Sequence, residues 1–329
     1  KFFVFSITIL CFGTISIAQS WTWTRKADMP FATANNAVCE ALVNGEKFMY
    51  SFGGIDTSKV YTGIHKRCFK YTFSSDQWVE IDTLPDATAN IAAGASFVKG
   101  KIYVFGGYTV FSNGNELSSD KVHIYNPETD EFEAEGSPIP IPIDDHVQCV
   151  YKDSLIFLVT GWSNNGNKPF VQIYNPSLDE WQVGTSVPQS IFFTAFGASG
   201  DIVGDTLYYF GGAAGGSFNA RSYMRKGFIH PDDPTIIDWE QMEDAPGEPG
   251  YRAACSSTDD LIFWVGGSSV SYNYNGIAYN GSGGVSPSAR VLHYSSPNRY
   301  YSDEVNQPYG VMDLRGLAKF PGDQWMICG

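Results

Sequence analysis

The feature that most constrains this chain is a short apolar segment that ends on a pair of small residues and recurs through the sequence. The clearest copy covers residues 101–107 and ends on Gly106 and Gly107. The first residues of the six pairs stand at positions 53, 106, 160, 211, 266 and 329, so the spacing is 53, 54, 51, 55 and 63 residues. A chain of 329 residues can form two domains on length alone, but this repeat predicts one closed array of similar units.

Each repeat is interpreted as four antiparallel strands. The first strand follows a proline, as in residues 89–97, and the glycine-pair segment is the second. The third ends on an Asn-Pro turn after Tyr125 or Tyr174, and the fourth carries an aromatic residue such as Trp181. Glycine has no Cβ, so we expect each pair to let an aromatic ring from the adjacent strand pass close to the backbone.

These motifs in combination identify a family. The segment 103–107, the turn at Tyr125-Asn126-Pro127 and an aromatic residue a few positions later resemble the kelch repeat. The resemblance covers nearly all of residues 21–329, with five complete repeats and a partial sixth. It implies an all-β propeller with four-stranded blades, of the kind that galactose oxidase also contains. We therefore expect a six-bladed kelch-type β-propeller over 21–329 that is truncated at its C-terminus. Its incomplete last blade would be closed by an N-terminal strand at 21–25.

Residues 1–20 are interpreted as a secretory signal peptide, because Lys1 precedes an apolar stretch and small residues follow it. A signal joined to kelch repeats resembles proteins exported by Bacteroidetes-type bacteria. We therefore expect a secreted or cell-surface bacterial protein, with no membrane insertion once the signal is removed. We also expect a monomer.

Composition and net charge limit the classes of partner that this chain is expected to bind. The net charge is −14, and no run of Lys and Arg opposes it, which argues against nucleic acid as a partner. Export permits disulfides, but Cys39, Cys149 and Cys255 fall at similar places in alternate repeats, where a ring would hold them apart. We expect these three to be small buried residues. Cys39 and Cys328 form the one pair that ring closure can bring close.

Polar residues that follow the proline crossovers are the first candidate site. Successive strands of a blade reverse, so the start of the first strand and the end of the second lie at the same end of the ring. We expect these residues to surround the central channel there and to bind a ligand, or alternatively to pair only with one another. They are Asn35, Asn36, Asn90, Asp144, Asp145, His146, Thr194, Arg252, Asp313 and Arg315. Because His146, Arg252 and Arg315 each stand 14 residues before a pair, we treat them as equivalent.

The loops after the second strands are the second candidate site. They are rich in Tyr, Asn and Gly, and rigid aromatic faces beside adaptable amides suit both sugars and protein surfaces. The residues expected to bind there are Trp162, Asn165, Phe218, Tyr272, Tyr274 and Tyr279.

Signals for catalysis are weak, and we predict no catalytic residue, metal or cofactor. No nucleophile elbow, Walker loop or dinucleotide fingerprint accompanies the repeats, and no residues match the copper site of galactose oxidase. The leading hypothesis is a binding module for a protein or glycan ligand. One alternative is a sugar mutarotase or epimerase that uses Asp145, His146, Arg252 and Arg315. Another is a structural spacer before a C-terminal sorting domain.

Overall fold

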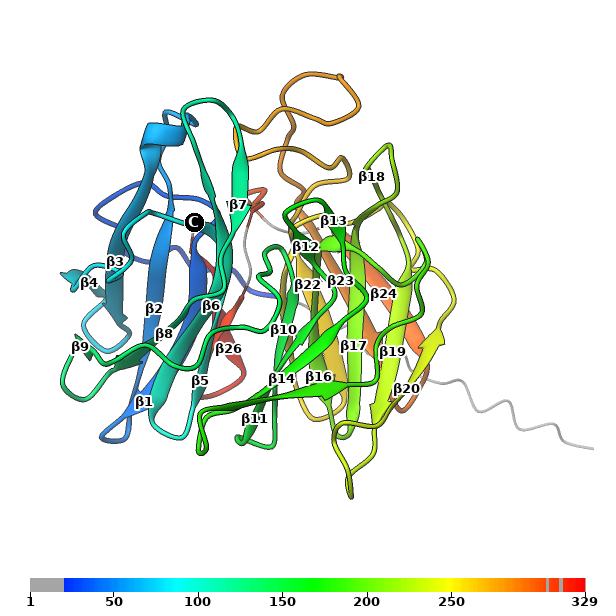
Figure 1. Ribbon diagram of the computed structural model, residues 1–329, viewed down its shortest axis with the longest axis horizontal. Helices are drawn as coiled ribbons and strands as arrows, with labels where there is room; N and C mark the ends of the chain where they lie inside the picture. The colour runs from blue at the N-terminus through cyan, green and yellow to red at the C-terminus, as the bar shows by residue number, and fades with distance from the viewer. Residues whose placement is uncertain (1–20, 306–307, 314–315, 329) are drawn as a thin grey trace, which may run out of the picture.

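The computed structural model describes residues 21–305, 308–313 and 316–328, and it forms a β-propeller of five blades (Figure 1). In each blade the first strand lies innermost, against the first strands of its neighbours. The predicted signal peptide, residues 1–20, lies outside the described residues. The part of the chain that the structure describes contains no helix long and apolar enough to cross a membrane.

The five blades follow one another along the chain, and each is an antiparallel sheet of four consecutive main strands. Blade 1 consists of β1 (Ala37–Val43), β2 (Glu46–Ile55), β3 (Ile64–Thr72) and β4 (Gln77–Ile81). Blade 2 consists of β5 (Ile91–Val98), β6 (Lys101–Val110), β8 (Val122–Asn126) and β9 (Glu131–Phe132). Blade 3 consists of β10 (Val147–Tyr151), β11 (Leu155–Val159), β14 (Val171–Asn175) and β15 (Glu180–Gly184). Blade 4 consists of β16 (Phe196–Val203), β17 (Thr206–Ala214), β19 (Met224–Ile229) and β20 (Ile237–Gln241). Blade 5 consists of β21 (Ala254–Ser257), β22 (Leu261–Val265), β23 (Arg290–Ser295) and β24 (Tyr300–Val305).

Short additional strands extend blades 2, 3 and 4 beyond their second strands, all toward the same end of the ring (Figure 1). We call this end, where the second strands finish and the first strands begin, the mouth face. The additional strands are β7 (Glu116–Ser118), the hairpin of β12 (Trp162–Ser163) and β13 (Gly166–Asn167), and β18 (Asn219–Ala220). A single 3₁₀ turn at Tyr61–Gly63 follows β2 at the same end.

The expectation of six four-stranded blades is wrong. The sixth repeat contributes only β25 (Ala318–Phe320) and β26 (Gln324–Met326), which pair as a two-stranded sheet between blades 5 and 1. Residues 21–25, expected to supply a closing fourth strand, form no strand. A fourth strand pairs with a third, and the described residues of this sheet provide only the first two. Side chains hold the N-terminal segment instead: the Trp21 indole N–H donates to His293 Nε2 at 2.7 Å.

The glycine pairs serve a different neighbour from the one expected. A Cβ on Gly106 would lie 2.1 Å from the carbonyl oxygen of Ile143, just before the next blade. The N–H of Gly107 donates to that same carbonyl at 3.0 Å. Both glycines have positive φ, 64° and 84°. The pair therefore admits a backbone carbonyl of the following blade, and the expected aromatic ring is not the group it accommodates.

The tyrosine turns also connect one blade to the next. In blade 3 the Tyr174 hydroxyl donates to Asp179 Oδ1 at 2.6 Å, and the same oxygen accepts the N–H of Ser137 from the segment after blade 2 at 2.7 Å. The Trp181 indole N–H donates to the carbonyl of Ser137 at 2.9 Å. One turn motif thus closes its own hairpin and fixes the neighbouring blade.

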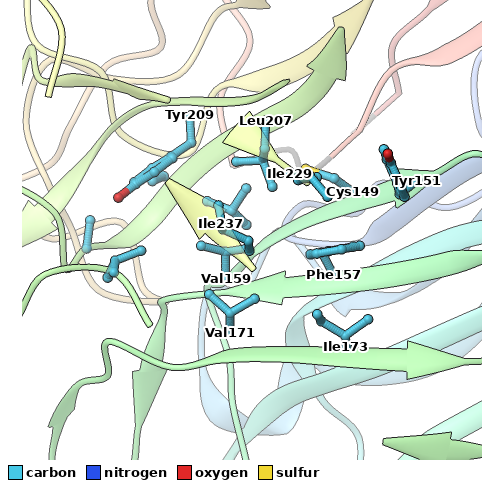
Figure 2. Close-up of a cluster of buried hydrophobic side chains, with 14 residues drawn as sticks. Cys149, Tyr151, Phe157, Val159, Val171, Ile173, Leu207, Tyr209, Ile229 and Ile237 are labelled. Carbon is cyan, nitrogen blue, oxygen red and sulfur yellow. The ribbon is translucent and has the colours of Figure 1, made fainter. Parts of the chain in front are cut away.

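Apolar side chains fill the interfaces between successive blades. Figure 2 shows the interface of blades 3 and 4, where Phe157 and Ile173 of blade 3 share a buried cluster with Leu207 and Ile229 of blade 4. All four side chains are fully buried. Burial of each contributes about 1.5–3 kcal/mol relative to exposure, so the lateral contacts carry much of the stability.

The described cysteines form no disulfide. Cys39, Cys149 and Cys255 are buried on the first strands of alternate blades, as the sequence predicts. Cys328 lies close to blade 1, where the Asn36 amide donates to its Sγ at 4.0 Å, but it is also free. Burial raises the pKa of all four thiols.

Candidate functional site

A closed ring of backbone hydrogen bonds surrounds the propeller axis at the mouth face. Each blade contributes one residue just before or at the start of its first strand, and Asp313, in the segment before β25, contributes the sixth. Each N–H donates to the carbonyl of the previous residue in the ring, over 2.7–3.3 Å, and every one of these residues has a positive φ between 51° and 68°. In ring order they are Asn35, Ala92, Asp145, Gly197, Arg252 and Asp313.

The ring shows that the equivalence of His146, Arg252 and Arg315 expected from the sequence is wrong by one residue in blade 3. Arg252 occupies the same place as Asp145 and Asp313, and His146 stands one residue further along. The regular spacing to the small-residue pairs misplaced His146 because the hairpin between β10 and β11 has three loop residues, 152–154, where the hairpin between β5 and β6 has two, Lys99 and Gly100. Arg315, the third residue of the expected set, lies outside the described residues.

Arg252 is the ionic centre of the ring. Its Nε and Nη2 donate to the two carboxylate oxygens of Asp145 at 3.0 and 2.7 Å, and Nη1 donates to Asp313 at 3.0 Å. Its side chain is 1% exposed. Burial alone would lower the pKa of Arg252, but the charges of Asp145 and Asp313 together with the Tyr251 hydroxyl raise it well above its ordinary value. The guanidinium is therefore permanently charged, and it joins blades 3 and 5 to the segment before β25.

The other candidates from the channel are buried as well, and several have polar partners nearby. The Asn36 amide donates to Ser51 Oγ at 2.7 Å, and the Thr194 hydroxyl donates to the Ser190 carbonyl at 2.9 Å. Asn90 Oδ1 accepts a bond from Thr109 at 2.5 Å, and His146 Nε2 lies 2.9 Å from Gln148 Oε1. Ligand binding by Asn35, Asn36, Asn90, His146 and Thr194 stays a prediction.

A long loop of blade 5, residues 266–289, covers the mouth. Figure 1 shows it in orange, above the ends of the neighbouring blades. Tyr272 is buried against Tyr251, and both rings lie within 5.3 Å of the Arg252 guanidinium carbon. Tyr274 reaches the apolar side chains of blades 1 and 2. The loop thus shields the ionic centre from solvent.

Beside this loop lies a cavity of about 140 Å³. Its walls combine three carboxylates with aromatic rings from blades 3, 4 and 5. The predicted residues that the fold brings together here are Asp144, Asp145, Trp162, Phe218 and Tyr279. The rings meet edge to face, with centroids 5.5 Å apart for Trp162 and Phe218 and 5.2 Å apart for Phe218 and Tyr279. We call this cavity the mouth pocket.

Two important wall residues escaped the sequence analysis. Glu116 lies on β7, and Phe196 begins β16. Glu116 follows an Asn-Gly-Asn turn after the second strand of blade 2, so extending the loop search to that blade would have found it. The sequence contained no pattern that could identify Phe196 as a wall residue, because an aromatic residue at the start of a strand is common in protein cores. Asn165 is exposed on the turn between β12 and β13 and is not a wall residue.

The described residues contain no cluster of three or more His, Cys, Asp or Glu side chains arranged to hold a metal ion.

Comparison with known proteins agrees with this architecture. Residues 92–138 match the kelch motif. The chain is a kelch-repeat β-propeller. It is 26% identical over 194 residues to Kelch-like protein 36 of Bos taurus, covering 59% of this chain and 29% of that protein. It is 24% identical over 225 residues to an N-acetylneuraminate epimerase of Escherichia coli O139:H28, covering 67% of this chain and 54% of that protein.

The propeller is also similar to the solved structure of YjhT, with a TM-score of 0.69 and 15% identity, and the match covers 89% of each chain. At that identity the likeness concerns the fold alone. The propeller spans between about a quarter and a half of the curated relatives that it matches. Their activities and partners therefore do not transfer to it directly.

Proposed function

We propose that the propeller is a binding module that takes a protein partner at its mouth face. Kelch propellers are commonly protein-interaction modules, which supports this class of function. The observation that carries the proposal is the placement of exposed apolar side chains. Val60, Phe111, Leu117 and Ile277 are between 41% and 52% exposed, and all four lie on segments that follow a second strand.

These side chains lie at the mouth face, where the acidic and aromatic mouth pocket also lies. Protein interfaces typically combine apolar and aromatic anchors at the centre with polar groups around them, and contiguous exposed apolar surface marks such sites. Aliphatic side chains such as Val60, Leu117 and Ile277 offer no hydrogen bonds to sugar hydroxyls. The exposed apolar side chains at the mouth face therefore suit a protein surface better than a glycan. The loops that carry it are also held against one another, which limits the entropy lost on binding.

The test is a selection of displayed peptides on the purified protein, followed by calorimetry with the selected sequences. Replacing Phe111 and Ile277 together by serine is expected to weaken binding about tenfold or more, because truncated interface anchors typically cost more than 1 kcal/mol. Leu178→Ser is the matched control, since Leu178 is 63% exposed on the turn between β14 and β15, at the opposite end of the blade.

Selected peptides that bind the double variant as well as the parent would contradict the proposal. Binding on a glycan array without any selected peptide would replace the protein partner by a sugar.

The similarity to an N-acetylneuraminate epimerase raises an enzymatic alternative. Asp145 and Arg252, two of the residues expected to act on a sugar, are bound to each other and are 2% and 1% exposed. The carboxylates of the mouth pocket would repel a sugar acid. Binding is therefore favoured over catalysis. NMR can measure whether the parent protein accelerates the exchange of sugar anomers. Acceleration that is lost in His146→Ala would favour catalysis over binding.

Export stays part of the proposal, because it depends on residues 1–20. Expression of the full chain in a bacterial host, with the protein recovered outside the cytoplasm and shortened by about 20 residues, is the expected result. Recovery of the uncleaved protein in the cytoplasm would contradict it.

A further inference from the structure

The second strand of the sixth repeat, β26, has an open hydrogen-bonding edge. In the part of the chain that the structure describes, β26 pairs with β25 alone, whereas the second strand of each blade pairs with both a first and a third strand. We propose that this edge takes an extended strand of the protein partner, which lies in the groove beside β26. The inference rests on the proposed function for the source of the strand, but the strand addition itself rests on the edge and the groove.

The first observation is the backbone of the edge. An edge strand presents amide N–H and carbonyl groups that have no partner in their own sheet, so it is a template for an added strand. Residues 324–328 line the groove. Counted from positions 266 and 329, they are equivalent to Leu261–Val265 of β22, which pair with residues 291–295 of β23 along their whole length. A strand as long as residues 291–295 therefore matches the open edge.

The second observation is the groove along this edge, which has a volume of about 1,330 Å³. Pockets for whole small molecules usually hold about 300–1,000 Å³, so this groove has room for a segment of polypeptide. Its walls are apolar on both sides. Trp23 and Phe263 line it beside blade 5, and Phe73, Trp78 and Met326 line it beside blade 1. A strand in the groove would therefore contact apolar side chains on both of its faces.

The third observation is the composition of the strands that take this place in the complete blades. In β14 the residues 171–174 are all buried, and in β23 the residues 290–294 are all buried. A strand that is covered on both faces reads as an unbroken, largely apolar run and not as an alternation of apolar and polar residues. The segment of the partner is therefore expected to be extended and to carry such a run.

The groove continues into the surface that is proposed to bind the partner. Asp56 and Lys59, which follow β2 at the mouth face, line the groove, and Val60 is the next residue. Gly276 also lines the groove, and Ile277 follows it. Val60 and Ile277 are two of the exposed apolar side chains that carry the proposed function. A partner seated on these side chains can therefore extend a segment along the groove to β26.

A peptide with the sequence of residues 119–130, which contains the third strand β8, is the probe for strand addition. It is expected to bind the purified protein in calorimetry. Methylation of the backbone nitrogens at alternate residues of its strand gives two further peptides. One of the two should bind at least about tenfold more weakly, because one set of amides faces β26 and loses its hydrogen bonds. Equal binding of all three peptides would overturn the strand addition.

Hydrogen exchange locates the added strand. In the complex, the amides of residues 324–328 that face the groove should exchange at least about tenfold more slowly, because hydrogen bonds to the peptide protect them. The outer strand β15 is the internal control, since it also lies at the edge of its sheet and should be unaffected. Protection of β15 equal to that of 324–328, or no protection at 324–328, would show that the edge of β26 is not the site.

A pair of charge substitutions tests the groove. Met326→Glu places a carboxylate among the apolar walls and should weaken the peptide about tenfold, because the charge loses water when the groove is filled. Val183→Glu adds the same charge to β15, where Val183 is 75% exposed, and should leave the affinity unchanged. Melting temperatures equal to that of the parent establish that the variants fold. Unchanged affinity in a folded Met326→Glu protein would overturn the groove, and if this variant does not fold, hydrogen exchange in the parent decides.

The source of the strand is tested with the peptides selected on the mouth face. They are expected to protect residues 324–328 as the probe does. If they lose affinity in the Phe111 and Ile277 double variant but leave 324–328 unprotected, this inference fails while the proposed function stands. If the probe adds to β26 but no selected peptide depends on Phe111 and Ile277, the proposed function fails while the strand addition stands.

Discussion

The interface between blades 3 and 4 and the sector around β25 and β26 close the same ring in different ways. Between blades 3 and 4, aliphatic and aromatic side chains from complete sheets interdigitate in a fully buried cluster. In the β25–β26 sector, Trp21, Trp325 and Ile327 are only partly buried, and a groove of about 1,330 Å³ runs beside them. Apolar packing between neighbouring sheets is therefore more complete between blades 3 and 4 than beside the β25–β26 sector.

The sector is joined to the rest of the ring by polar contacts at the mouth face and along its strands. At the mouth face, Asp313 accepts the Arg252 guanidinium, and its backbone continues the ring of hydrogen bonds to Asn35 and Arg252. Toward the opposite end, Glu40 of β1 accepts the N–H of Lys319 at 3.1 Å. The comparison teaches that a propeller can be closed by a few well-placed polar contacts where the apolar interface is incomplete. The following predictions test this difference between the two regions.

The largest effect is expected from Arg252→Ala. Removing one member of a buried ion pair leaves Asp145 and Asp313 without that partner, which typically costs about 3–5 kcal/mol in the free energy of unfolding. Chemical denaturation followed by tryptophan fluorescence measures the loss. Arg25→Ala is the control, because Arg25 pairs with Asp28 on the surface, where solvent screens the pair, and should leave stability almost unchanged. A loss at Arg252 no larger than at Arg25 would show that the ring needs no ionic centre.

Next in size is a pair of matched truncations. Ile173→Ala in the interface of blades 3 and 4 should cost about 2–4 kcal/mol, since the side chain is fully buried and its removal leaves a cavity. Ile327→Ala in the β25–β26 sector should cost about 1 kcal/mol, since that side chain is partly exposed. Equal losses in the same denaturation experiment would mean that the two regions are packed alike.

The last prediction is a pH dependence beside the β25–β26 sector, where His293 of β23 binds the N-terminal segment through Trp21. Burial lowers the pKa of His293 to about 4, with Asp303 acting in the opposite direction. The unfolded chain takes up a proton near pH 6.5 that the folded chain refuses until about pH 4, so stability is retained above pH 6.5 and falls between these values. The loss attributable to His293 should be at most about 3 kcal/mol, which is the free energy that corresponds to this shift in pKa.

This contribution is isolated by a comparison of two proteins. His293→Gln should show a shallower decline between pH 6.5 and pH 4 than the parent, in denaturation curves measured at each pH. His230→Gln is the control, because His230 is exposed and near Asp238 on blade 4. A parent and a His293 variant with parallel pH profiles would contradict the assignment.

Much of the mouth was predictable, but its arrangement was not. The position of the candidate residues after the proline crossovers follows from strand alternation, and four of them, Asn35, Asp145, Arg252 and Asp313, lie in the hydrogen-bonded ring around the axis. Their burial under residues 266–289 could not be predicted. A Tyr-rich loop has the same composition whether it projects into solvent or folds over a channel. Glu116 was missed because the search of the loops did not extend to blade 2.

The sequence by itself determined the repeating unit: apolar strands ending on glycine pairs, tyrosine turns closed by Asp179 and its equivalents, and one first strand per repeat. These are local patterns, and local hydrogen bonds and close backbone approaches specify them. Only the tertiary structure decided that the described residues of the sixth repeat form a two-stranded sheet, that Arg252 is equivalent to Asp145, and that the N-terminal segment binds through Trp21 and not through strand pairing. Those outcomes depend on contacts between residues as much as 272 positions apart, such as Trp21 with His293, and no periodic pattern encodes the energy of such a contact.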